Sequence, residues 1–266
     1  MIAMTNLANQ LRAAAFLASR DAYVKGAFAL PALWVAWVLL TALLAPAGTV
    51  MSMSFESGFL GFVSWGSCFG TCLAVTGLVV HDLSSGGLRA AMVSAGGRQA
   101  YVASRAILAL ALAVLLSAWS ALLGLLFLLV PHVCEGASAA ELALRVLART
   151  LVSWTYAVFG LLLLWLARRS RGFGGTVLVA ALLGAGLLNY VLMLPLIALI
   201  PLSSVVPALQ GVAYGMFQLL APLIPSALLG SVTGAAGLDL LPVVTCVVCV
   251  IACLAASRAL MARASL

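Results

Sequence analysis

Long apolar runs separated by short polar stretches dominate this chain. Six of them, at residues 28–45, 59–80, 107–130, 150–167, 176–200 and 240–256, approach or exceed the roughly 20 residues that a helix needs to cross a bilayer. Strands of a membrane barrel would instead alternate apolar and polar residues over about 10 positions, and the sequence lacks that pattern. We therefore predict an all-α integral membrane protein with six transmembrane helices.

Composition agrees with that class. Hydrophobic residues make up 65% of the 266 positions and charged residues only 7%. No soluble fold of this length has enough interior to hide so much apolar surface. The net charge of +7 does not indicate nucleic acid as a partner, because the basic residues are spread among short loops, where they set the membrane topology.

The distribution of basic residues predicts which side each loop faces. With the N-terminus in the cytoplasm, eleven of the thirteen Lys and Arg residues fall on the cytoplasmic side, and only Arg145 and Arg149 fall outside. Both termini are then cytoplasmic and the number of full spans is even. We expect a single transmembrane domain over 1–266, with a cytoplasmic amphipathic helix in 1–27, six spans in 28–257 and a cytoplasmic tail in 258–266.

Two segments outside the six runs have patterns of their own. Residues 5–26 place apolar side chains at helical spacing, which favours an amphipathic interfacial helix on the membrane surface; a frayed, partly helical tail is the alternative. Residues 201–240 are apolar but broken by proline and glycine. A re-entrant helical hairpin on the outer side, between spans 5 and 6, preserves the even parity, and a loose apolar loop on the outer leaflet is the alternative.

Few residues offer chemistry. Motifs of the forms GxxxxGK[ST], HExxH and GxSxG are absent. His81 beside Asp82 could serve acid–base catalysis or metal binding, although a helix cap or solvated boundary is the commoner role of such a pair. The thiols of Cys246, Cys249 and Cys253 fall near one helix face, where packing explains them better than a metal site.

The interiors of the predicted spans carry almost no charge. Asn189 and scattered Ser and Thr interrupt them, which argues against a proton relay, so any uphill transport would draw its energy from outside the chain. In the second run, Gly66 and Gly70 have the GxxxG spacing that lets helix backbones approach closely.

The polar insert at 81–105 follows the second run and faces the cytoplasm in this topology. Together with the six spans, the amphipathic N-terminal helix and the outer hairpin, it resembles the coupling region of ABC-2 type transporter permeases. Those proteins place an acidic residue, a glycine, a short apolar-basic helix and then Arg, an aromatic and a basic residue. The matching positions here are Asp82, Gly86 or Gly87, the stretch 88–93, Arg98, Tyr101 and Arg105. Asp82 stands where Glu is commoner, and Gly96-Gly97 replaces a Pro-x-Ser.

The length resembles that of stand-alone permeases of bacterial peptide and lantibiotic immunity exporters. The resemblance implies a multi-pass permease of the bacterial cytoplasmic membrane that is not itself an enzyme and binds no cofactor. ATP and Mg²⁺ would bind to separate ABC ATPase subunits, and a second permease subunit, identical or related, would complete the transporter. The implied ATPase-coupling residues are Asp82, Gly86, Gly87, Leu88, Arg89, Met92, Arg98, Tyr101 and Arg105.

The resulting functional hypothesis is an ATP-driven exporter for an amphipathic or hydrophobic substrate, such as a peptide or lantibiotic, a drug or a lipid-like molecule. The residues that form the substrate pathway are not identified by the sequence. A non-transporting immunity protein that sequesters a peptide at the outer face is the alternative, and an intramembrane enzyme is a third hypothesis. The insert itself has a simpler interpretation as a solvated linker whose arginines lie at the lipid head groups.

Overall fold

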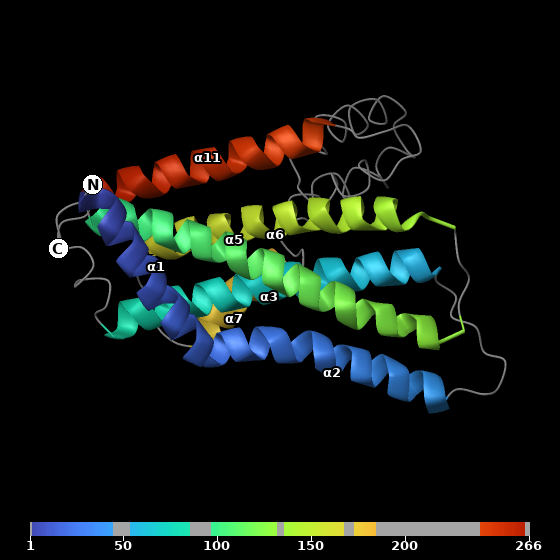
Figure 1. Cartoon of the computed structure of the whole chain (residues 1–266). Helices are drawn as coiled ribbons and strands as arrows, with labels where there is room; N and C mark the ends of the chain where they lie inside the picture. Colours follow the sequence, from blue (N-terminus) through green and yellow to red (C-terminus); the bar gives the residue numbers. More distant parts are fainter. Residues whose placement is uncertain are drawn as a thin grey trace, which may run out of the picture.

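The chain folds into a bundle of long helices. The computed structural model describes residues 2–44, 54–85, 97–131, 136–167, 173–184 and 240–263, and the elements within these ranges are all helical. In chain order they are α1 (Ile2–Arg20), α2 (Ala22–Leu44), α3 (Phe55–Ser85), α5 (Gly97–Gly124), the 3-10 helix η1 (Leu125–Leu129), α6 (Ala139–Ala167), α7 (Phe173–Gly184) and α11 (Leu240–Arg263). Figure 1 shows α2, α3, α5, α6 and α11 running along the length of the bundle.

Five of the described segments are long and apolar enough to cross a membrane. They are Ala22–Leu44, Phe55–Ser85, Gln99–Leu129, Ala139–Leu166 and Val243–Ala262. The predicted helical class, with several helices long and apolar enough to span a membrane, is thereby confirmed for the described residues. The predicted span at 176–200 is described only as far as Gly184, in α7, and nearly all of the predicted hairpin at 201–240 lies outside the described residues.

Several helices are longer than the apolar runs from which the spans were predicted. Glu56 lies in the first turn of α3, and the polar insert contributes helix at both ends, because α3 continues to Ser85 and α5 begins at Gly97. Residues 139–149 are also helical. Ser138 caps them by accepting the backbone N–H of Glu141 at 3.2 Å, and this stretch consists mostly of strong helix formers. Polar side chains thus interrupt the hydropathy without ending a helix.

Asp21 separates α1 from α2, so the single helix predicted over 5–26 is wrong at its end. The Oδ1 atom of Asp21 accepts hydrogen bonds from the backbone N–H groups of Tyr23 at 2.8 Å and Val24 at 3.3 Å. This is the usual geometry of an N-cap, in which a short acidic side chain satisfies amides that lack a partner within the helix. Residues 22–26 therefore belong to the first membrane-spanning helix.

The apolar face of α1 contacts protein. Ala14 and Ala18 are buried, Leu7 and Leu11 are half-buried, and Ala15 is exposed. This spacing places one stripe of the helix against the bundle, where α1 packs mainly on α5. The position of α1 at a membrane surface stays a prediction.

The central helix of the bundle is α3. It packs against α2, α5, α6 and α7, and 78% of its membrane-crossing window is buried, against 17% for α2 and for α11. Glycines allow α3 to pack closely against its neighbours on two sides. A Cβ atom added at Gly66 would lie 2.4 Å from Ser120 Oγ of α5, and one added at Gly77 would lie 2.5 Å from the Tyr23 side chain of α2. The missing side chains let these helices approach closely.

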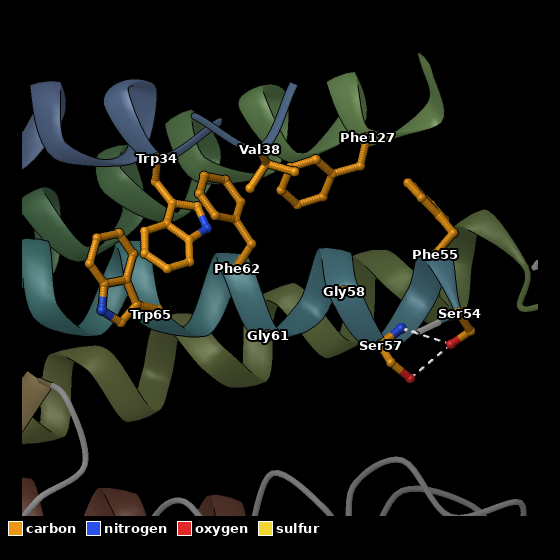
Figure 2. A pocket seen from close by; sticks show the side chains of 10 residues that line it. All are labelled: Trp34, Val38, Ser54, Phe55, Ser57, Gly58, Gly61, Phe62, Trp65 and Phe127. Carbon is orange, nitrogen blue, oxygen red and sulfur yellow. Dashed lines mark hydrogen bonds between the residues drawn. The ribbon is translucent and has the colours of Figure 1, made fainter. Parts of the chain in front are cut away.

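A pocket of about 400 Å³ lies between α2, the first half of α3 and η1. Figure 2 shows Trp34 and Val38 of α2 facing Phe62 and Trp65 of α3, with Phe127 of η1 at one side. In the predicted topology these ends of the helices face the outside. The pocket therefore lies at the opposite end of α3 from the polar insert.

Candidate functional site

The predicted coupling region is described at its two ends, where α3 finishes and α5 starts. Of the nine predicted residues, Asp82, Tyr101 and Arg105 have described side chains. Arg98 lies in the first turn of α5, with a side chain outside the described set. The other five, Gly86, Gly87, Leu88, Arg89 and Met92, lie outside the described residues, as does the short helix predicted near 87–94.

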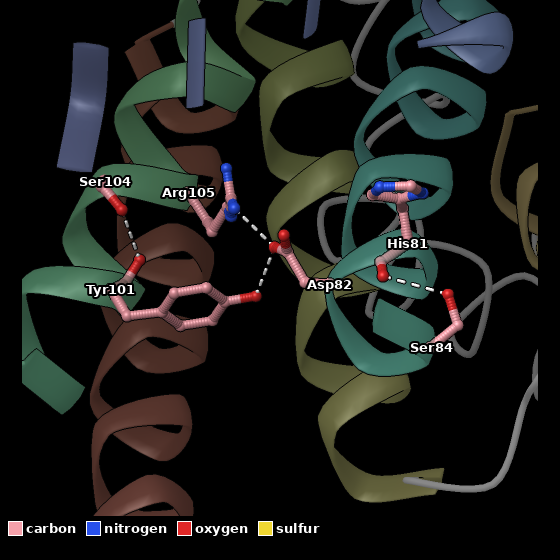
Figure 3. Close-up of polar contacts among 6 residues, drawn as sticks. All are labelled: His81, Asp82, Ser84, Tyr101, Ser104 and Arg105. Carbon is pink, nitrogen blue, oxygen red and sulfur yellow. Dashed lines mark hydrogen bonds and ion pairs between the residues drawn. The ribbon is translucent and has the colours of Figure 1, made fainter. Parts of the chain in front are cut away.

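The three described residues meet. Tyr101 and Arg105 are four positions apart on α5, so their side chains project from one face of the helix, and this face is turned toward Asp82 on α3 (Figure 3). The hydroxyl of Tyr101 donates a hydrogen bond to Oδ2 of Asp82 at 2.9 Å. The Nη2 atom of Arg105 donates to the same oxygen at 2.5 Å.

This ion pair is buried. The side chains of Arg105 and Asp82 are 8% and 7% exposed, and Tyr101 is 3% exposed. A charge in such surroundings is tolerated only when it is paired and hydrogen-bonded, and removal of one partner typically destabilises a fold by about 3–5 kcal/mol. The three side chains therefore hold the end of α3 to the start of α5.

Aromatic contacts extend the link to α6. The guanidinium carbon of Arg105 lies 5.1 Å from the centre of the Tyr101 ring, and that ring lies 6.3 Å from the ring of Trp165. Trp165, near the end of α6, is 4% exposed. No sequence pattern pointed to Trp165, because an aromatic residue near the end of an apolar run is equally compatible with a lipid-facing position.

His81 takes no part in this cluster. Adjacent residues of a helix point in different directions, and His81 is exposed whereas Asp82 is buried. Figure 3 shows the Ser84 hydroxyl donating to the backbone carbonyl of His81 at 3.0 Å, while Asp82 points toward α5. The two side chains are therefore not arranged as an acid–base pair. Because its Oδ2 atom accepts two hydrogen bonds, Asp82 acts as a link between helices.

The thiols follow the packing of the bundle. Cys246 of α11 is buried in one apolar cluster with Cys72 of α3 and Tyr156 of α6, while Cys249 and Cys253 are half-buried. Within the described ranges, no group of three or more His, Cys, Asp or Glu side chains is placed to hold a metal ion.

Two charged residues that the predicted spans did not include lie within long helices, toward the opposite end of the bundle. Glu56 of α3 is 3% exposed, and its Oε1 atom accepts the backbone N–H of Gly136 at 3.0 Å. Arg149 of α6 donates from Nη1 to the Ser64 hydroxyl of α3 at 2.7 Å. The helices are longer than the apolar runs, and their extra turns carry these charges into contact with α3.

No protein-family model matches this chain, and no curated protein matches it either. The functional assignment therefore depends on the residues themselves and on their arrangement.

Proposed function

We propose that this chain is the membrane-spanning permease subunit of an ATP-driven exporter of the ABC-2 type. Its substrate class would be amphipathic or hydrophobic, because the predicted spans offer few charges to a passing polar molecule. The energy would come from separate ATPase subunits that dock on the segment between α3 and α5. A second permease subunit would complete the transporter in the bacterial cytoplasmic membrane.

The observation that carries the proposal is the buried contact of Asp82 with Tyr101 and Arg105. These residues flank the segment 86–96, to which the resemblance assigns the ATPase contact. Contacts that join α3 to α5 beside this segment would let the two helices move together when the ATPase acts on it. The ion pair supplies that joint between α3 and α5, and Trp165 extends it to α6.

The central position of α3 supports the same function. Its buried length connects the Asp82 end of the bundle with the pocket end, over about 1.5 Å per residue of helix. A rigid buried helix transmits a displacement at one end to the other, because packed interiors have low compressibility. Movement at the segment 86–96 would thus be felt at the far ends of α2 and α3.

Co-purification with an ATPase tests the proposal. The permease would be expressed with a candidate ABC ATPase, and complex formation and ATP turnover would be measured. Leu88→Asp and Arg89→Glu should weaken both. Arg12→Glu makes the same charge reversal as Arg89→Glu, at an exposed position of α1, and serves as the matched control. Unchanged complex formation and turnover in the two segment variants would refute the coupling role.

A non-transporting immunity protein is the competing function. The pocket at the predicted outer end favours it, since a binding site there needs no ATPase to reach an external peptide. Cells that carry the permease gene without the ATPase gene separate the two functions. Protection of such cells against the peptide would support sequestration, and its loss would support transport.

A further inference from the structure

The pocket between α2 and α3 has the size and the lining of a small-molecule site. Its volume of about 400 Å³ falls within the range of roughly 300–1,000 Å³ that is usual for small-molecule sites. Ten described residues line it, and none of them is charged. Glu56, the nearest acidic residue in sequence, is buried with its carboxylate bonded to the backbone of Gly136.

Aromatic rings make up much of its wall. The rings of Trp34 and Trp65 have their centres 5.3 Å apart at an angle of 36°. Those of Phe62 and Phe127 lie 5.3 Å apart at 67°. Aromatic rings attract other rings through offset faces and edges, so a wall that contains five aromatic rings, Phe55 included, favours an aromatic ligand over a flexible alkyl chain.

Two glycines keep the pocket open. Gly58 and Gly61 lie one turn apart on α3 and line it (Figure 2). A Cβ atom added at either position would meet nothing within 4 Å, whereas Cβ atoms at Gly66 and Gly77 of the same helix would clash with neighbouring side chains. The first two glycines therefore border empty space, and the other two allow helix contact.

One end of the pocket is polar without being charged. Ser54 donates a hydrogen bond to the Ser57 hydroxyl at 2.8 Å and accepts the backbone N–H of Ser57 at 3.2 Å. Figure 2 shows this pair at the end of the pocket that also holds Phe55. Hydroxyls both donate and accept hydrogen bonds, so this end suits a neutral polar group.

We propose that this pocket binds an uncharged aromatic amphiphile, with its ring system among Trp34, Phe62, Trp65 and Phe127 and its hydroxyl or amide group at Ser54 and Ser57. Trp34 is 50% exposed on α2, beside Leu33 and Trp37. Such exposed apolar side chains on a membrane-spanning helix face hydrocarbon, so the ligand enters sideways from the bilayer. If the chain is an exporter subunit, this ligand class is its substrate class. Binding to this chain alone can be measured without the ATPase.

Binding of N-phenylnaphthylamine to the purified full-length chain in lipid nanodiscs tests it. The probe is an uncharged aromatic amine that accepts excitation energy from tryptophan. We expect a saturable component of energy transfer in addition to linear partition into lipid. Gly61→Leu fills the pocket and should weaken that component by at least about tenfold, which corresponds to roughly 1.4 kcal/mol. Gly26→Leu is the matched control, because a Cβ at Gly26 of α2 also meets nothing within 4 Å and Gly26 does not line the pocket.

Competition identifies the class of ligand. An uncharged aryl alcohol should displace the probe, and a linear alkanol of equal carbon number should not. Equal displacement by the alkanol would overturn the assignment, because the pocket would then accept lipid-like chains. Purely linear energy transfer in the unsubstituted chain, or an undiminished saturable component in Gly61→Leu, would also overturn it. The assay contains no ATPase, so these outcomes leave the proposed transport function to its own test.

Discussion

Arg105 of α5 and Asp82 of α3 form a buried ion pair in which Nη2 lies 2.5 Å from Oδ2. Twenty-three positions separate them in sequence. The same carboxylate oxygen accepts the Tyr101 hydroxyl, so a single atom receives two donors from one face of α5. A substitution at Asp82 therefore affects more than one interaction.

Stability should depend on whether the buried charges remain balanced. Asp82→Val leaves the Arg105 guanidinium without its counter-charge, and we expect a loss of about 3–5 kcal/mol in the free energy of unfolding. The triple variant Asp82→Val, Tyr101→Phe, Arg105→Met removes all three polar groups together. Since apolar replacement of a whole buried pair is often neutral, it should be more stable than Asp82→Val alone. Thermal unfolding in detergent measures both, and a triple variant no more stable than the single one would contradict this account.

The Tyr101 hydroxyl should contribute less than the ion pair. Tyr101→Phe removes one hydrogen bond to the Asp82 carboxylate and keeps the ring between Arg105 and Trp165, so we expect a loss of about 1.5–3 kcal/mol. Ser104→Ala is the control. Its hydroxyl bonds to the Tyr101 carbonyl within the same helix, at 2.8 Å, and its removal should change the melting temperature less. A loss in Tyr101→Phe as large as that in Asp82→Val would mean that the hydroxyl carries the interaction.

Transport coupling can be separated from stability with the same triple variant. If the ion pair transmits movement from the ATPase, the triple variant should fold and bind the ATPase yet lose stimulation of ATP turnover by substrate. A purely structural role predicts normal stimulation once the fold is restored. Substrate-stimulated turnover in nanodiscs, compared with basal turnover in the same preparation, distinguishes these results.

Sequence patterns were sufficient for the class of fold. Hydropathy located five of the six predicted spans as helices long and apolar enough to cross a membrane. The resemblance named Asp82, Tyr101 and Arg105, which the structure brings together, and their role in coupling stays a prediction. Hydropathy misplaced the helix ends, however, because capping by Ser138 and the helix propensity of residues 139–149 extend α6 through polar positions. The burial of Glu56 has the same origin, since it lies in a turn of α3 that the apolar run does not include.

The sequence alone did not predict which residues of different helices contact one another. The partnership of Asp82 with α5 depends on how two helices pack, and a single sequence does not encode that register in any local pattern. Trp34, Trp65 and Phe127 illustrate the same limit. Aromatic residues in an apolar run look alike whether they face lipid, the protein core or a pocket, and their grouping emerges only when α2, α3 and η1 are assembled.

Close packing of α3 against α5 should make Gly66 sensitive to substitution. In Gly66→Ala the new Cβ would lie 2.4 Å from Ser120 Oγ and 3.2 Å from Ser120 Cβ. The resulting overpacking should destabilise the fold by about 1–3 kcal/mol. Adding Ser120→Ala removes the nearer atom and should restore part of the loss. Gly61→Ala provides the control, because its Cβ meets open space and the gain in helix propensity favours it.

Membrane topology provides a test of the number of spans. Five described helices can cross the membrane, and five spans with a cytoplasmic N-terminus would place the C-terminus outside. A sixth span at 176–200 returns it to the cytoplasm, as the charges of Arg258 and Arg263 favour. We therefore expect green fluorescent protein fused at the C-terminus to fluoresce and alkaline phosphatase fused there to be inactive. Phosphatase inserted at Ser138, before α6, should be active because that end of the bundle faces outward. A dark C-terminal fluorescent fusion, with phosphatase active both there and at Ser138, would show that 176–200 does not cross the membrane, because α6 and α11 would then supply the two crossings between these points.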